Sequence, residues 1–212
     1  MITVIGNLKG GSGKSTVTFN LAGWLAVHGE RVVAFDLDPQ ATLTDVSEVR
    51  REEGYQPVVE VRPLHDNVAA GLLREEAEVL VDVGASNISG MRDALTVADR
   101  VLVPVPPSQA DIWSTQRFLA IVQESVSPQK HPHIFVFVNR ADTHHAVRES
   151  DEAEEALAQL PGVELLRHRL CQRTIFRRSF SEGLAVFELE PDSKGAVEFE
   201  VLAGALYPRL SS

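Results

Sequence analysis

The chain has 212 residues, of which 44% are hydrophobic, and its formal net charge is −10. It is long enough for one sizeable core, and its single cysteine, Cys171, excludes an internal disulfide framework and a cysteine-based zinc or iron–sulfur site. No run approaches the ~18 apolar residues that a membrane span needs, and so acidic a chain can bind nucleic acid only through a local basic patch. Because the first strand begins without a charged leader, we expect a cytoplasmic protein.

The first element is an apolar strand, Ile2–Gly6, and it leads through a glycine-rich loop into an apolar-periodic helix. The loop reads Lys9-Gly10-Gly11-Ser12-Gly13-Lys14-Ser15-Thr16. A loop of this kind offers backbone N–H groups and the positive end of a helix dipole to phosphates, and its glycines let the backbone approach them. Lys14 is placed to reach the β- and γ-phosphates, and Ser15 to bind Mg²⁺. The general pattern has glycine where this chain has Leu8, and the extra Lys9 marks a variant form.

Strands and helices then alternate to the end of the chain. Strands are expected at Ile2–Gly6, Arg31–Asp36, Val58–Val61, Val79–Val83, Arg100–Pro104, His133–Val138 and, in a shorter run, Val163–Leu166. Helical spacing joins Val17, Leu21, Trp24 and Leu25, then Met91, Leu95 and Ala98, then Ile112, Leu119 and Val122, and finally Val197, Val201, Ala205 and Leu206. Trp24 and Trp113 fall inside these patterns and are expected in the core. The alternation predicts an α/β fold, a single domain over 1–212 with a doubly wound, mostly parallel sheet and helices on both faces.

Local signals mark three helix ends. Gly29 follows the first helix as a stop, a Ser108/Asp111 capping box opens the helix that carries Ile112, and the last helix is expected to begin at Asp192.

Carboxylates follow two of the predicted strands. Asp36 and Asp38 come after the second strand, and Asp82 ends the run Val79-Leu80-Val81-Asp82. The carboxyl ends of parallel strands converge on the ligand crevice, where phosphoryl hydrolysis needs Mg²⁺ and a positioned water. A single aspartate at such a place is as readily a helix or turn cap, but three of them beside a phosphate loop indicate a metal and water site.

Three motifs together resemble one family. They are the lysine-first loop Lys9–Thr16, the segment Asp36-Leu37-Asp38-Pro39-Gln40-Ala41-Thr42 and the run Ala98-Asp99-Arg100-Val101-Leu102-Val103-Pro104-Val105. They resemble the ParA partition ATPases, relatives of MinD with the deviant Walker A loop. The similarity extends through Phe135–Arg140 to Pro191–Lys194, and it is greatest to short members without an N-terminal DNA-reading domain.

The resemblance implies an ATP- and Mg²⁺-dependent sandwich dimer with a P-loop NTPase fold. Its catalytic residues would be Lys9, Lys14 and Asp38, with Lys9 crossing to the partner's phosphates and Asp38 orienting the attacking water. Ser15 would bind Mg²⁺, with Asp36 and Asp82 in its outer shell. The nucleotide-binding residues would be Lys9, Gly10, Gly11, Ser12, Gly13, Lys14, Ser15, Thr16, Asn139, Arg140 and Pro191, with Asn139 and Arg140 by the adenine and the Pro191 segment closing over the base.

The resemblance also implies partners: a second copy of the chain, non-specific DNA and a ParB-like centromere-binding or adaptor protein, at the nucleoid and without membrane attachment. One segment departs from the family. Many relatives have a proline-rich turn after the Mg²⁺ aspartate, whereas this chain has Asp82-Val83-Gly84-Ala85-Ser86, and the second switch is therefore not assigned.

Five arginines lie in a stretch of the chain without acidic residues: Arg167, Arg169, Arg173, Arg177 and Arg178. Such a cluster is typical of a surface that binds DNA phosphates without reading bases. The alternative is a solvated helix face or a set of ion pairs to surface acids.

Two other functions remain open. A small-molecule enzyme of the dethiobiotin-synthetase type could use the same loop, although Lys9 argues against it. A MinD-like, membrane-recruited regulator of a non-DNA cargo would need a basic amphipathic C-terminal helix, whereas residues 198–212 contain acids and only Arg209 as a base.

Overall fold

The computed structural model describes residues 1–127, 130–144 and 148–210. It contains one eight-stranded sheet in which every pairing is parallel, in the order β3-β2-β4-β1-β5-β6-β7, with β8 beside the end of β6. The strands are β1 (Ile2–Gly6), β2 (Val32–Asp36), β3 (Glu60–Pro63), β4 (Glu78–Val83), β5 (Arg100–Val105), β6 (His133–Ala141), β7 (Glu164–Leu165) and β8 (Leu170–Cys171).

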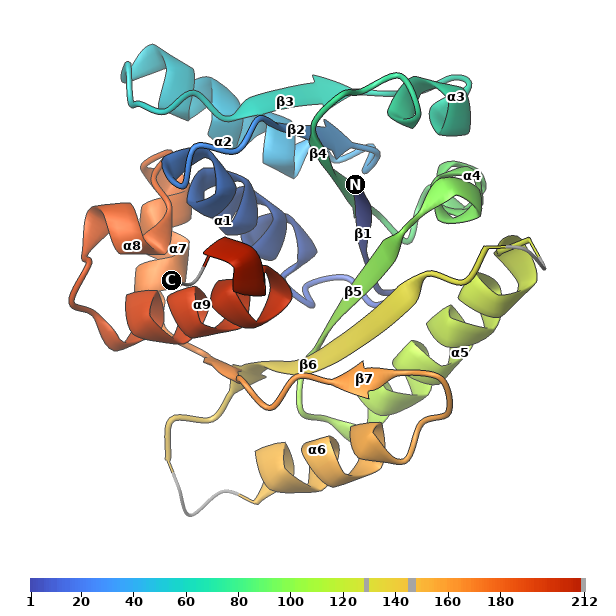
Figure 1. The fold of residues 1–212 in the computed structure, drawn as a ribbon. Helices are drawn as coiled ribbons and strands as arrows, with labels where there is room; N and C mark the ends of the chain where they lie inside the picture. The colour runs from blue at the N-terminus through green and yellow to red at the C-terminus, as the bar shows by residue number, and fades with distance from the viewer. Residues whose placement is uncertain (128–129, 145–147, 211–212) are drawn as a thin grey trace.

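Helices cover both faces of this sheet (Figure 1). They are α1 (Lys14–Val27), α2 (Thr42–Glu52), α3 (Val68–Leu72), α4 (Ile88–Val97), α5 (Gln109–Ser125), α6 (Glu149–Ala158), α7 (Thr174–Ser181), α8 (Val186–Leu189) and α9 (Lys194–Leu206), with a 3-10 turn at Pro208–Leu210. The α3, α4, α5 and α6 side chains form one apolar core with the sheet, and those of α1, α2, α7, α8 and α9 form the other. The predicted doubly wound α/β fold is confirmed. Among the described residues, no helix is long and apolar enough to cross a membrane.

Two predictions about buried faces are wrong. Trp24 is buried as expected, but Trp113 is 53% exposed on α5. On α9, Val197 and Val201 are 51% and 47% exposed, because the helix packs through another stripe of apolar side chains. That stripe is Ala196, Phe199, Leu202, Ala203 and Leu206. Both helices carry more apolar positions than one buried face can hold, so periodicity alone did not select the face.

The helix ends differ from the predictions only in detail. Gly29 follows α1 with a φ of 80°, and α9 begins at Lys194 with Ser193 as its cap. Ser108 caps α5 by accepting a hydrogen bond from the Asp111 backbone. The Asp111 side chain does not complete the predicted capping box; it turns to Lys9 at the phosphate loop.

Candidate functional site

The phosphate loop joins β1 to α1 at the carboxyl edge of the sheet. Gly11 and Gly13 have φ values of 76° and 91°, in the left-handed region that favours glycine. Gly13 also has no room for a side chain, because a Cβ there would lie 2.3 Å from the Asn139 Nδ2 atom. Asn139, at the end of β6, donates from this atom to the Ser12 carbonyl at 2.7 Å. The loop is therefore held against β6, and the structure brings the predicted phosphate residues and Asn139 together.

Lys14 is buried inside this loop and donates to the Lys9 carbonyl at 3.3 Å. Burial lowers the pKa of its ammonium group, and the nearby Asp82 and Asp38 carboxylates partly offset that effect. The ammonium group thus interacts electrostatically with two of the three predicted acids, Asp82 and Asp38.

Asp36 and Asp82 end neighbouring strands in direct register. One Asp36 oxygen accepts from the Thr44 backbone and hydroxyl groups, both at 2.9 Å, and the other accepts from the Asp38 backbone at 3.1 Å. Asp82 lies beside Ser15, but neither of its carboxylate oxygens accepts a hydrogen bond of good geometry from the described residues. A buried carboxylate without donors needs a proton or a cation.

The electrostatics of Asp82 follow from this geometry. The pKa of Asp82 is raised to about 7, and burial is the largest cause; Asp36 and Asp38 add to the increase, while Ser15 and Lys14 act in the opposite direction. The combination of Ser15 with two buried carboxylates fits a hydrated Mg²⁺ ion, which prefers oxygen ligands and retains several waters.

Asp38 lies in the loop between β2 and α2. One of its oxygens accepts from the Gln40 backbone at 3.0 Å. Its carboxylate packs directly on Gly84, where a Cβ would lie 2.3 Å from the Asp38 Oδ2 atom. The segment after Asp82, which departs from the family pattern, therefore forms the surface on which the Asp38 carboxylate rests.

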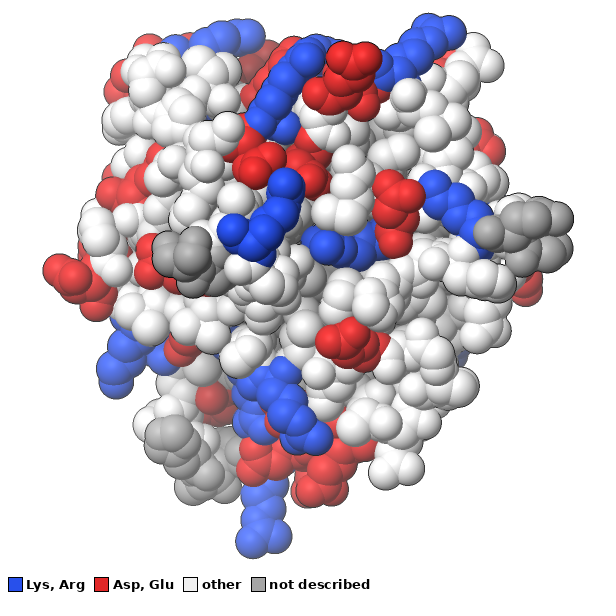
Figure 2. All heavy atoms as spheres, in the orientation of Figure 1, with Lys and Arg blue, Asp and Glu red and all other residues white. Residues whose placement is uncertain are grey.

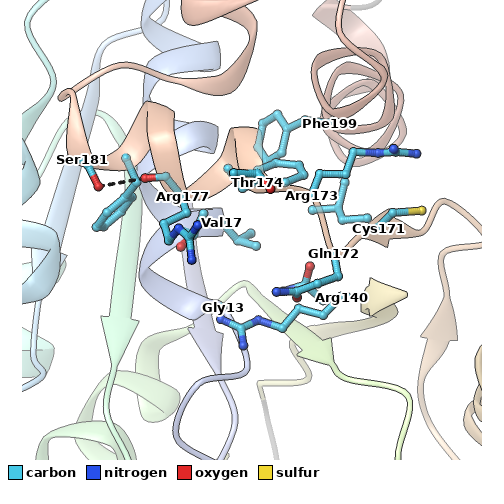
Figure 3. Close-up of a pocket in the computed structure, with 15 residues that line it drawn as sticks. Gly13, Val17, Arg140, Cys171, Gln172, Arg173, Thr174, Arg177, Ser181 and Phe199 are labelled. Atoms are coloured by element: carbon cyan, nitrogen blue, oxygen red, sulfur yellow. Dashed lines mark hydrogen bonds between the residues drawn. The ribbon is translucent and has the colours of Figure 1, made fainter. Parts of the chain in front are cut away.

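A cavity of about 450 Å³ opens beside the phosphate loop (Figure 3). Gly13, Thr16 and Asn139 line it together with the segment from β8 through α7. In Figure 3 the Arg140 side chain extends toward Gly13, and Arg177 reaches from α7 toward the start of α1. Arg140 has a φ of 58°, an uncommon conformation for a residue with a side chain. The position and size of the cavity suit a nucleoside attached to phosphates in the loop.

The cavity wall differs from the expected one. Pro191, expected to close over the base, is exposed and is not among the lining residues, whereas Cys171 lies partly exposed in the wall. Burial and the neighbouring Glu198 raise the pKa of the Cys171 thiol. Sequence reasoning did not assign Gln172, Thr174, Phe176 or Phe180 to the site, and their spacing around a short amphipathic helix contained no signal of a ligand.

The family model described as "CobQ/CobB/MinD/ParA nucleotide binding domain" matches residues 3–186. The chain belongs to the ParA/MinD family. The predicted resemblance of the chain to ParA proteins is thereby confirmed. Proteins of this family are P-loop ATPases that act in partition and positioning.

Three proteins to which the chain is similar have different names. The maintenance of carboxysome distribution protein A of Halothiobacillus neapolitanus is 25% identical over 198 residues, 92% of this chain and 90% of the relative. The apo structure of Cyanothece McdA has a TM-score of 0.79 at 20% identity, covering 97% of this chain and 98% of that one. A Borrelia burgdorferi plasmid partition protein bound to AMPPNP has a TM-score of 0.68 at 18% identity, covering 95% and 98%.

The five arginines do not share one uncompensated surface. Arg169 pairs with Asp151 and Glu154, Arg173 with Glu198, and Arg178 with Glu190. Arg167 and Arg177 are exposed, and no ion pair holds either of them within the described part of the chain. On the face that Figure 2 shows, basic and acidic side chains are interspersed. The acids come from α6, the turn between α8 and α9, and α9, and those of the hydrogen-bonded pairs lie 12, 15 and 25 positions from their arginines.

The pKa of Asp82 predicts how the ligand-free protein responds to pH. A carboxyl group whose folded pKa is raised from 3.8 to about 7 binds more protons folded than unfolded, so the stability it contributes falls as pH rises from about 4 to about 7. Asp82→Asn removes this penalty. In EDTA without nucleotide, we expect it to raise the free energy of unfolding by roughly 2–4 kcal/mol at pH 8 relative to wild type, and by less at pH 5. Denaturant titrations at the two pH values measure this; an equal effect at both would contradict the assignment.

The contact between Gly84 and Asp38 predicts a separation of stability from activity. A methyl group in Gly84→Ala displaces the Asp38 carboxylate, the movable end of a side chain, and leaves the backbone in place. We expect ATP hydrolysis to fall at least about tenfold, the size of a modest loss in positioning, while nucleotide affinity changes little. Thermal unfolding and a steady-state assay measure the two effects. Ala85→Gly is the matched control, and equal hydrolysis by wild type and Gly84→Ala would contradict the proposed role of this contact.

Proposed function

We propose that this protein is a positioning ATPase that hydrolyses ATP in a Mg²⁺-dependent sandwich dimer and uses the resulting cycle to distribute a cargo. The observation that carries this proposal is the position of Lys9. Its ammonium group lies 2.8 Å from Asp111 at the start of α5, whereas Lys14 already occupies the loop interior. A molecule with one lysine for its own phosphates and a second, 44% exposed lysine beside them is suited to donate the second one to another copy.

The other residues of the site have separate roles in phosphoryl transfer. Lys14 and the loop N–H groups bind the β- and γ-phosphates, and Ser15 binds Mg²⁺ with Asp36 and Asp82 behind it. A Mg²⁺ ion held there would supply positive charge opposite the charge that develops on the phosphates. Asp38, resting on Gly84, orients the attacking water.

The cavity holds the adenosine part of the nucleotide. Asn139 uses its NH₂ group to bind the Ser12 carbonyl, which leaves its side-chain oxygen to accept from a base. Arg140 lies beside it, and Pro191 reaches the base only if its segment moves toward the cavity when nucleotide binds.

The cargo is DNA or an assembly carried over DNA. Non-specific DNA binding rests on the exposed Arg167 and Arg177, since the other three arginines are committed to acids. An adaptor or ParB-like protein links the ATPase to its cargo at the nucleoid. The named relatives act on carboxysomes and on plasmids, and both cargoes suit this cycle.

Light scattering tests the dimer. Asp38→Ala, which blocks turnover, is expected to change from 23.2 kDa to twice that mass when Mg–ATP is added. Adding Lys9→Ala should keep the protein monomeric with nucleotide still bound, because the contact to the partner is lost; Lys194→Ala, also an exposed lysine, is the matched control. A monomer in Asp38→Ala with saturating Mg–ATP would overturn the proposal.

DNA binding is tested by comparing neighbouring arginines. Arg167→Ala and Arg177→Ala should each weaken binding of the ATP-bound protein and reduce the slope of log affinity against log salt by about 1, whatever the DNA sequence. Arg178→Ala is the control, because Glu190 already compensates its charge. Salt titrations with a fluorescent duplex measure this, alongside nucleotide affinity, since Arg177 lines the cavity. Equal losses at all three positions would contradict the assignment.

A further inference from the structure

Lys9, the first residue of the phosphate loop, has a partner within its own molecule. Its Nζ atom donates to the Asp111 Oδ2 atom at 2.8 Å, and the Ser108 hydroxyl binds the same oxygen. The two residues are 102 positions apart, so the contact joins the loop after β1 to the corner between β5 and α5. No feature of either motif in the sequence indicated it.

Asn7 reinforces this junction just before the loop. Its side-chain NH₂ group donates to the Pro104 carbonyl at 3.1 Å and to the Thr115 hydroxyl at 3.3 Å, and its oxygen accepts from the Ser114 hydroxyl and the Lys9 backbone. The backbone at Lys9 is therefore fastened to α5, and release of Lys9 can be a movement of its side chain alone.

The carboxylate of Asp111 depends on Lys9. Its side chain is only 4% exposed, and its Oδ1 atom accepts no hydrogen bond from the described residues. If the ammonium group leaves, a buried carboxylate remains with the Ser108 hydroxyl and the start of α5 as its compensation. Removing one partner of such a pair carries a large free-energy cost.

We propose that Asp111 restrains Lys9 in the single molecule and thereby opposes formation of the ATP-bound dimer. This inference rests on the proposed function, in which Lys9 crosses to the phosphates of a second copy. One ammonium group cannot bind both Asp111 and those phosphates, so each dimer breaks two Lys9–Asp111 pairs. The restraint sets how much binding free energy the contact between Lys9 and the γ-phosphate must provide before two molecules associate. When the two molecules separate, Lys9 pairs with Asp111 again.

Asp111→Asn tests the restraint, because it keeps the size and hydrogen-bonding capacity of the side chain and removes its charge. In the Asp38→Ala background with Mg–ATP, we expect the dimer Kd to fall at least about tenfold, because two Lys9–Asp111 pairs no longer have to break for each dimer that forms. A role limited to stability would weaken the dimer or leave it unchanged. Glu124→Gln is the matched control: it removes an acid near the other end of α5, where Glu124 pairs with Arg92, and should not change the Kd.

A second measurement needs no dimer. Without nucleotide, an amine-acetylating reagent should modify Lys9 faster in Asp111→Asn than in wild type, with the exposed Lys194 as an internal reference in the same mass spectrum. Should Asp111→Asn fail to fold, Asp111→Ser offers a hydroxyl near Ser108 and is read in the same way.

The outcomes separate the two proposals. A tighter dimer together with faster acetylation of Lys9 supports the restraint. A looser or unchanged dimer overturns it, as does unchanged acetylation. If no variant dimerises but Lys9 becomes more reactive, the Lys9–Asp111 contact holds Lys9 as described, and the dimer of the proposed function is what fails.

Discussion

The site depends on an excess of buried negative charge at the ends of β2 and β4. Asp36 and Asp82 lie in register, with Asp38 nearby and Lys14 as the buried cation among them. Asp36 obtains hydrogen bonds from Thr44 and the backbone, whereas Asp82 obtains none of good geometry within the described chain. Without a ligand, this arrangement is least costly when Asp82 is protonated. With a divalent cation, the same carboxylate becomes a favourable outer ligand, so binding of Mg²⁺ and nucleotide offsets the electrostatic cost of burying it.

The two lysines of the loop lie in different environments, and this arrangement keeps their ammonium groups apart. Two ammonium groups at one phosphate site repel each other until a polyphosphate lies between them. Lys14 is buried in the loop, and Lys9 is held away at Asp111. In the proposed cycle, Lys9 is needed only where a second molecule brings its own phosphates. Formation of the dimer therefore requires that Lys9 leave Asp111.

The parts of the molecule that the sequence predicted well are those governed by local chemistry. Apolar runs and a glycine-rich turn indicated the sheet, the phosphate loop and the acids at strand ends, because strand burial and φ above zero restrict residue type at single positions. The parts that it did not predict are contacts across the fold: Lys9 with Asp111, Asp38 on Gly84, and the acids that pair with three of the arginines. Periodicity also could not predict that Trp113 and Val197 are exposed, since both helices have apolar residues on more than one face.

The proton held by Asp82 offers the most direct test of this account. Calorimetric titration with preformed Mg–ADP, repeated in buffers of different ionisation enthalpy, measures the protons released on binding. With a pKa of about 7, Asp82 should release a large part of one proton at pH 6.5 and almost none at pH 8.5, and the release at pH 6.5 should be missing in Asp82→Asn. Equal proton release by wild type and Asp82→Asn at pH 6.5 would contradict the claim that an uncompensated buried carboxylate organises the site.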